Sequence, residues 1–137
     1  IDFLKNNEKI IFNCDREQIA RVFFNLIKNS IESIQEKSKK NIEFIKKIKI
    51  EILDNNDHIK FILVDNGLGF DKIKDDIKKI LNPYFTTKKN GTGLGLSIVN
   101  KIINDHNGKL DFFSVSDGAK TEIIFNLNGN RNSYSRW

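Results

Sequence analysis

Three short motifs, in a fixed order along the chain, constrain the fold most strongly because each needs a particular backbone setting. Residues Asn25–Asn29 place two amides one helical turn apart, and residues Asp65–Gly69 place a carboxylate beside two glycines. Residues Gly91–Ser97 carry three glycines that lead backbone N–H groups into a helix. A metal ion, a base and phosphates would each find a partner here, which predicts a site for a purine nucleoside triphosphate.

The pattern of apolar residues predicts the elements that carry these motifs. Asp15 and Gln18 have the spacing of an N-cap and its partner, and apolar residues then recur at three- and four-residue steps, which predicts a long amphipathic helix over about 16–37. The other expected elements are a strand over 10–14, a hairpin over 48–53 and 59–64, a helix over 72–81, a mobile loop over 84–93, a helix from about Gly95 to His106, and a hairpin over 109–115 and 120–127. This order indicates an α+β fold, a two-layer sandwich of one helical layer on one sheet.

Composition limits the class of protein. The 137 residues suit one domain, placed at 1–128, with a frayed tail over 129–137. No apolar run approaches the roughly 18 residues that span a bilayer, and no signal-peptide pattern is present. The abrupt start suggests a piece of a longer protein, so any membrane anchor would lie elsewhere. The net charge of +5 does not indicate nucleic acid, because the densest basic stretch, 37–49, alternates with apolar residues like a solvated connector.

The single cysteine and the two histidines indicate structure rather than chemistry. Cys14 is expected to be a small buried apolar residue. His58 lies next to a predicted turn and His106 ends a predicted helix, and neither has a convincing base or metal-ligand partner nearby in the sequence. No Cys/His cluster for zinc and no Ser-His-Asp arrangement is present.

Asn25 and Asn29 would present two amide oxygens on one face of the long helix, away from its apolar stripe. Such oxygens beside a triphosphate suit Mg²⁺, which keeps several waters and takes few protein ligands. Two ordinary surface or capping asparagines are an equally good explanation of this motif alone.

Asp65 follows the apolar run 61–64, so its carboxylate leaves the sheet where Gly67 and Gly69 let the backbone turn and approach a ligand closely. A carboxylate only accepts hydrogen bonds, so it would receive the amine of adenine and repel the carbonyl of guanine. ATP is therefore predicted over GTP. An Asx turn followed by glycines is the alternative.

The glycines of 91–95 precede a helix whose unpaired N–H groups and positive dipole end favour phosphate oxygens. Their spacing matches neither a P-loop nor a dinucleotide-binding fingerprint. Lys88 and Lys89 stand just before them and could reach phosphates. A flexible glycine-rich loop is the alternative.

These motifs together resemble the ATP-binding catalytic domain of sensor histidine kinases, in the GHKL superfamily. Residues Asn25–Ser30 resemble its N box, Asp65–Gly69 its G1 box, Pro83–Lys88 its F box and Gly91–Ser97 its G2 box. The resemblance spans about 10–127. The residues of its motifs are most similar to those of the nitrogen-regulation type of sensor kinase. It implies one mixed sheet covered on one face by about three helices.

The resemblance also implies residue roles. Asn29, assisted by Asn25, would hold Mg²⁺, Asp65 would bind the adenine amine, and Thr121 would lie behind the base. Residues 83–85 would belong to a lid that touches the phosphoacceptor domain. The implied catalytic residues are Asn25, Asn29 and Lys88. The implied nucleotide-binding residues are Asn25, Lys28, Asn29, Asp65, Gly67, Gly69, Thr87, Lys88, Gly91, Thr92, Gly93, Leu94, Gly95, Leu96 and Thr121.

Three positions depart from the family or from its hydrolytic branches. Leu81 stands where many F boxes begin with phenylalanine, and Ser30 where alanine is commoner. Asn25 stands where hydrolytic members of the superfamily carry a glutamate that activates water. An asparagine cannot act as a general base, so the site suits placing ATP for another nucleophile.

The sequence thus predicts the ATP-binding catalytic domain of a two-component sensor histidine kinase, in its cytoplasmic portion. Its expected ligands are ATP and Mg²⁺, and its expected partners are an upstream dimerisation and phosphoacceptor domain and a response regulator. Nucleic acid and direct membrane contact are not expected. The alternatives are a serine kinase of the anti-sigma type and a nucleotide-gated binding module without transfer.

Overall fold

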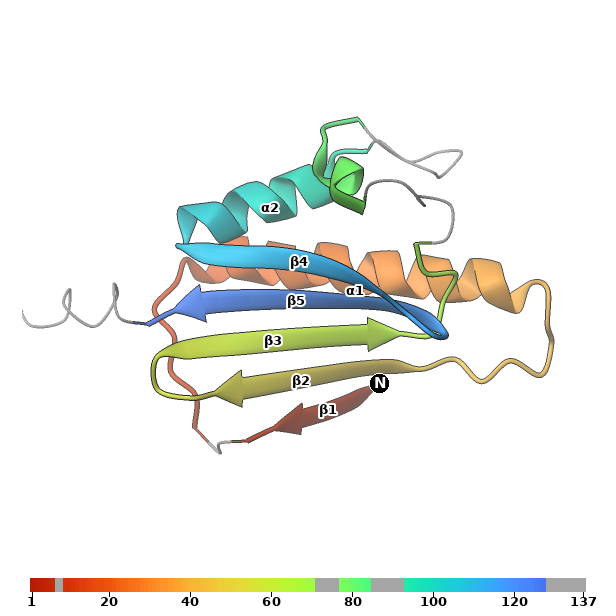
Figure 1. Ribbon diagram of the computed structural model, residues 1–137, viewed down its shortest axis with the longest axis horizontal. Coiled ribbons are helices and arrows are strands. Elements are labelled where there is room, and N and C mark those ends of the chain that lie inside the picture. Colours follow the sequence, from red (N-terminus) through yellow and green to blue (C-terminus); the bar gives the residue numbers. More distant parts are fainter. Residues whose placement is uncertain (7–8, 71–76, 85–92, 128–137) are drawn as a thin grey trace, which may run out of the picture.

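The computed structural model describes residues 1–6, 9–70, 77–84 and 93–127. Its elements, in chain order, are β1 (Asp2–Lys5), α1 (Arg16–Ser38), β2 (Ile48–Asp54), β3 (His58–Asp65), the 3₁₀ helix η1 (Ile77–Leu81), α2 (Gly95–Asp105), β4 (Gly108–Val115) and β5 (Gly118–Asn126). The strands form one five-stranded sheet in the order β1-β2-β3-β5-β4 (Figure 1). β1 pairs with β2 in parallel and every other pairing is antiparallel, so the sheet is mixed as expected.

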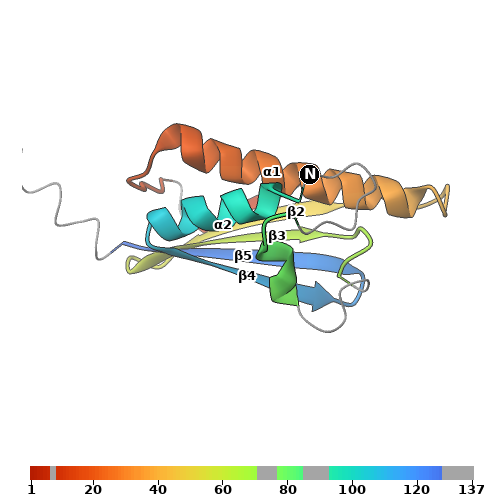
Figure 2. The same ribbon diagram turned by 90° about the horizontal axis from the view of Figure 1, so that it is seen from above.

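The helices lie on one face of the sheet (Figure 2). The Asp15 side chain accepts a hydrogen bond of 3.1 Å from the N–H of Gln18, which caps α1 as its sequence predicts. One stripe of α1 is buried, at Ile19, Val22, Leu26, Ser30 and Ile34. The core lies between the helices and the sheet. Its fully buried side chains come from both layers and include Val22, Ile59, Val99, Ile103, Ile123 and Phe125.

The expected strand over 10–14 is wrong. Residues 9–15 form no strand, and the strand that precedes α1 is β1. Within this segment the side chains of Phe12 and Cys14 are half-buried, whereas those of Ile11 and Asn13 are exposed. The ring of Phe12 packs 4.6 Å from that of Phe125.

The long helix, the helix from Gly95 and the two hairpins are observed with small changes of boundary. The helix expected over 72–81 is a short 3₁₀ helix over its described part, 77–81. Residues 72–76, most of the expected loop over 84–93, and the tail over 129–137 lie outside the described residues. Within the part of the chain that is described, no helix combines the length and apolar character needed to cross a bilayer.

His106 ties the end of α2 to the start of α1. Its Nδ1 lies 2.7 Å from the carbonyl oxygen of Ile102, and its Nε2 accepts a 3.1 Å hydrogen bond from the N–H of Asp15. A carbonyl can only accept and an amide N–H can only donate, so these contacts select the neutral tautomer with the proton on Nδ1. His106 therefore has the structural role expected of it.

Candidate nucleotide-binding site

Asp65 ends β3 on the helix-covered face and is only 7% exposed. The N–H of Gly67 donates to its Oδ1 at 2.9 Å, and the hydroxyl of Ser30 on α1 donates to its Oδ2 at 2.8 Å. Burial raises the pKa of Asp65, and the Gly67 and Ser30 hydrogen bonds and the Lys37 charge oppose that rise. Asp65 is thus a carboxylate held in a fixed orientation, with both oxygens engaged and spare lone pairs on each.

The glycines after Asp65 let the backbone of this turn pack closely, chiefly against other parts of the protein. A Cβ at Gly67 would lie 2.4 Å from Oγ of Ser33, so α1 leaves no space for a side chain. Gly69 has φ +69°, and a Cβ there would lie 2.6 Å from the carbonyl oxygen of Gly118. The turn over 65–69 is therefore packed between α1 and the β4–β5 turn.

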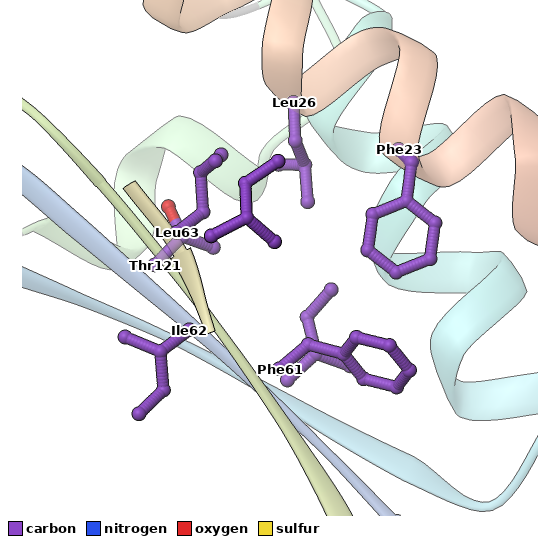
Figure 3. Close-up of a pocket in the computed structure, with 8 residues that line it drawn as sticks. Phe23, Leu26, Phe61, Ile62, Leu63 and Thr121 are labelled. Atoms are coloured by element: carbon purple, nitrogen blue, oxygen red, sulfur yellow. The ribbon is translucent and has the colours of Figure 1, made fainter. Parts of the chain in front are cut away.

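Thr121 is buried on β5 and shares the helix-facing side of the sheet with Asp65. It pairs with Leu63, while Asp65 pairs with Ala119 two residues along β5. Thr121 lines a small cavity of about 10 Å³ between α1 and the sheet, beneath Leu26 (Figure 3). The cavity is lined by Phe23, Leu26, Ile50, Phe61, Ile62, Leu63, Thr121 and Ile123. Thr121 therefore lies two residues along β5 from the partner of Asp65, on the same face of the sheet and further into the core.

Asn25 joins α1 to the N-terminus of α2. Its Nδ2 donates to the carbonyl oxygen of Arg21 at 2.9 Å, which leaves Oδ1 directed away from its own helix. A Cβ at Gly95 would lie 3.5 Å from that Oδ1, so the amide oxygen lies against the first residue of α2. Asn29 lies one turn further along α1 and is half-buried. Nζ of Lys28 lies 3.9 Å from Oε1 of Glu32, one turn along the same helix.

At the N-terminus of α2, the N-cap residue supplies no capping side chain. Leu94 is its N-cap residue and makes no side-chain capping hydrogen bond, while the hydroxyl of Ser97 donates back to the Leu94 carbonyl at 2.9 Å. Gly93 has φ +70°, and a Cβ there would lie 2.3 Å from the carbonyl carbon of Tyr84, itself at φ +66°. This helix end can therefore receive an anion through its N–H groups and its dipole.

The described part of the predicted site falls into two groups. Asp65, Gly67, Gly69 and Thr121 lie around the end of β3 and its pairing with β5. Asn25, Gly93, Leu94, Gly95 and Leu96 lie where α1 meets the N-terminus of α2, and Lys28 and Asn29 follow Asn25 on α1. The predicted residues Thr87, Lys88, Gly91 and Thr92 lie outside the described residues.

Sequence reasoning missed the residues that hold the Asp65 turn. The sequence pattern does not single out Ser33 or Lys37, and it marks Ser30 only as a departure from alanine. A usable signal was present, because Ser30 falls on the apolar stripe of α1, where a hydroxyl needs a buried partner. No comparable signal marks Gly118, whose closeness to Asp65 depends on strand pairing.

The family of histidine kinase-, DNA gyrase B- and HSP90-like ATPases matches residues 14–131. The chain belongs to this family. Among its relatives, an NtrY-like sensor histidine kinase of Rickettsia conorii is 39% identical over 126 residues, which cover 91% of this chain and 20% of that protein. The signal transduction histidine-protein kinase AtoS of Escherichia coli K12 is 35% identical over 132 residues, covering 93% of this chain and 20% of AtoS.

A solved structure agrees with this assignment. The catalytic domain of histidine kinase ThkA superposes with a TM-score of 0.74 at 33% identity, covering 90% of this chain and 76% of that one. The chain is therefore an ATP-binding catalytic domain of the sensor histidine kinase type. It spans 20% of the length of the NtrY-like and AtoS relatives.

Proposed function

We propose that this domain binds Mg-ATP and presents the γ-phosphoryl group to a histidine of another domain, outside this chain. The observation that carries the proposal is Asn25, whose Oδ1 faces the N-terminus of α2. This is where the phosphates are expected, and an amide there can orient a ligand but cannot take a proton from water. The site therefore favours transfer over hydrolysis.

Asp65 supplies the base recognition. Its carboxylate is held by donors from Ser30 and Gly67, and its remaining lone pairs can accept the 6-amino group of adenine. The 6-carbonyl oxygen of guanine would meet a negative charge at the same point. This supports ATP as the nucleotide, with Thr121 behind the base.

Asn25 and Asn29 would hold the Mg²⁺ ion. Amide oxygens are hard ligands of the type that Mg²⁺ accepts alongside phosphate oxygens and water, and Oδ1 of Asn25 is directed towards the phosphate end of the site. The bound ion would neutralise charge on the phosphate oxygens.

The transfer step needs positioning and charge stabilisation from this domain. A nitrogen of the acceptor histidine would attack the γ-phosphorus, the bond from that phosphorus to the bridging oxygen of ADP would break, and ADP would leave with the bonding electrons. The N–H groups and dipole of α2 would stabilise charge on the phosphates. Lys88 would add a further positive charge.

The remaining partners follow from this reaction. The acceptor histidine would lie on an upstream dimerisation domain, and a response regulator would receive the phosphoryl group afterwards. We place the domain on the cytoplasmic side of the cell, where ATP is available.

A single-turnover assay with γ-labelled Mg-ATP tests the proposal. This chain is mixed with the separately expressed segment encoded just upstream, and the label is followed by its stability to acid and base. We expect acid-labile label on the upstream segment and none on this chain alone. Acid-stable label would support a serine kinase instead, and free phosphate without labelled protein would support a hydrolytic ATPase. Self-labelling of this chain would contradict the proposed division between domains.

A further inference from the structure

The turn that carries Asp65 is bonded to one face of α1. Ser30, Ser33 and Lys37 follow one another at three- and four-residue steps, so their side chains emerge on the same side of the helix. The hydroxyl of Ser30 bonds the Asp65 carboxylate, and Oγ of Ser33 accepts a 2.9 Å hydrogen bond from the N–H of Leu68. α1 thus holds both ends of the turn.

Ser30 fixes the plane of the carboxylate. It is 4% exposed, so its hydroxyl has little access to water and its 2.8 Å bond to Oδ2 of Asp65 satisfies a buried donor. The N–H of Gly67 holds Oδ1 at 2.9 Å. One donor on each oxygen prevents rotation of the carboxylate, and the plane of the group then determines where its remaining lone pairs point.

Lys37 holds the middle of the turn. Its Nζ donates to the carbonyl oxygens of Asn66 and Gly67, both at 3.0 Å, and forms an ion pair with Asp117 in the β4–β5 turn. An ammonium group has three donors, so these three oxygens use all of them. Hydrogen bonds from a charged donor are stronger than neutral ones, so a single side chain fastens two turns to α1.

The β4–β5 turn blocks movement from the other side. A Cβ at Gly118 would lie 1.9 Å from the carbonyl oxygen of Asp65, which shows how closely the two backbones approach. The Asp65 turn is therefore held between this contact and the bonds from α1.

We propose that Ser30 and Lys37 are positioning residues for adenine recognition, which act through Asp65 and its turn and set how strongly the domain prefers a purine with a 6-amino group. The inference rests on the role of Asp65 in the proposed function. It follows from the steep dependence of a hydrogen bond on its angle, because a carboxylate free to rotate meets the 6-amino N–H out of line.

Affinities for two nucleotides distinguish a role in positioning Asp65 from a general loss of structure at the site. Affinity is measured by calorimetry for ATP and for purine riboside triphosphate, which lacks the 6-amino group, and the ratio of the two dissociation constants reports the preference for that group. We expect Ser30→Ala and Lys37→Met to weaken ATP binding about 5- to 30-fold and to change the binding of purine riboside triphosphate little. A purely structural role would weaken both nucleotides equally.

Matched controls come from the same end of the helix. The hydroxyl of Ser38 bonds the carbonyl of Gln35 within α1, and Lys39 pairs with Glu36 at the surface. Ser38→Ala and Lys39→Met should therefore leave both affinities unchanged. Circular dichroism and thermal melting establish that each variant is folded.

Asp65→Asn distinguishes failure of the inference from failure of the adenine assignment. If Asp65→Asn loses the preference for ATP while Ser30→Ala and Lys37→Met keep the wild-type ratio, the positioning role is overturned and the assignment of Asp65 stands. If Asp65→Asn keeps the wild-type ratio, Asp65 does not bind the amine, and both ideas fail.

Discussion

A buried carboxylate such as Asp65 costs the folded protein stability unless donors compensate for the lost water. Two hydrogen bonds reach it, from Ser30 and Gly67, yet the pKa of Asp65 remains above its usual value because desolvation outweighs them. A buried carboxylate with a raised pKa marks a candidate functional site.

Asp65→Asn should separate stability from binding. Between the unfolded pKa of Asp65 and its raised folded pKa, the folded state binds more protons than the unfolded state, so stability falls as pH rises through that window and stays lower above it. The neutral amide avoids this loss and can still bond Ser30 and Gly67. We expect the variant to be at least as stable as wild type at pH 7, with its advantage disappearing towards pH 4, while ATP binding is lost.

Urea unfolding at both pH values measures the first part, and calorimetric titration with ATP measures the second. A variant that is clearly less stable than wild type at pH 7 would show that the charge itself supports the fold.

Gly118→Ala should damage the fold much more than Gly95→Ala. At Gly118 the backbone has φ +137° and a new Cβ would meet the Asp65 carbonyl oxygen at 1.9 Å, whereas at Gly95 the nearest atom is Oδ1 of Asn25, at 3.5 Å. We expect Gly118→Ala to lower the free energy of unfolding by at least about 2 kcal/mol. Gly95→Ala should change it by less than about 1 kcal/mol. Equal melting temperatures for the two variants would contradict the geometry.

At the scale of the element, the sequence predicts best where two signals agree. The helix predicted over 16–37 is observed over 16–38 as α1, because the Asp15 cap marks its start and the apolar stripe marks its length. The stretch 10–14 has only its β-branched and aromatic residues in favour of a strand. Such residues say nothing of whether a neighbouring strand is available for hydrogen bonding, and none pairs with this segment among the described residues.

The N-cap of α1 provides a test at this scale. Asp15→Ala removes the 3.1 Å hydrogen bond to the N–H of Gln18 and should reduce stability by about 1 kcal/mol, or roughly 3–6 °C in melting temperature for a chain of this size. Asp15→Asn keeps a capping oxygen and serves as the control. If both substitutions lower the melting temperature equally, the charge or the fit of Asp15, rather than the cap, is responsible.

At the scale of the whole molecule, the described helices lie on one face of the sheet, and none of them covers the other face (Figure 2). On the uncovered face, charged side chains two residues apart on the same strand pair with each other, as in Lys109–Asp111 at 3.1 Å and Lys120–Glu122 at 3.1 Å. The two-layer architecture could be predicted because the order of helices and strands along the chain indicates one helical layer on one sheet, and a sheet covered on one face leaves its other face for such charges. The edge order could not, because β1 is a four-residue strand with no marked pattern.

Removal of β1 tests how much of the molecule the site needs. All four residues of β1 are exposed, and beyond it Asn6 exchanges two hydrogen bonds with the backbone of Asp54. Deletion of residues 1–6 should lower the melting temperature by a few degrees and leave ATP affinity within about twofold, since β1 lies at the sheet edge away from β5. A large loss of ATP affinity would mean that the edge strand supports the site.

The contact between His106 and Asp15 also sets a distance. α1 and α2 run in opposite directions, and this contact joins the start of one to the end of the other (Figure 1). Asn25 lies ten residues after Asp15, and Gly95 lies eleven residues before His106. At the rise of an α-helix these intervals are about 15 Å and about 16.5 Å, so a join at one end aligns the amide of Asn25 with the N-terminus of α2 at the other. A single-residue insertion in either helix would shift Asn25 relative to Gly95 by about 1.5 Å and rotate the helix beyond the insertion by about 100°. The lengths of these helices are therefore under the same constraint as the residues of the site.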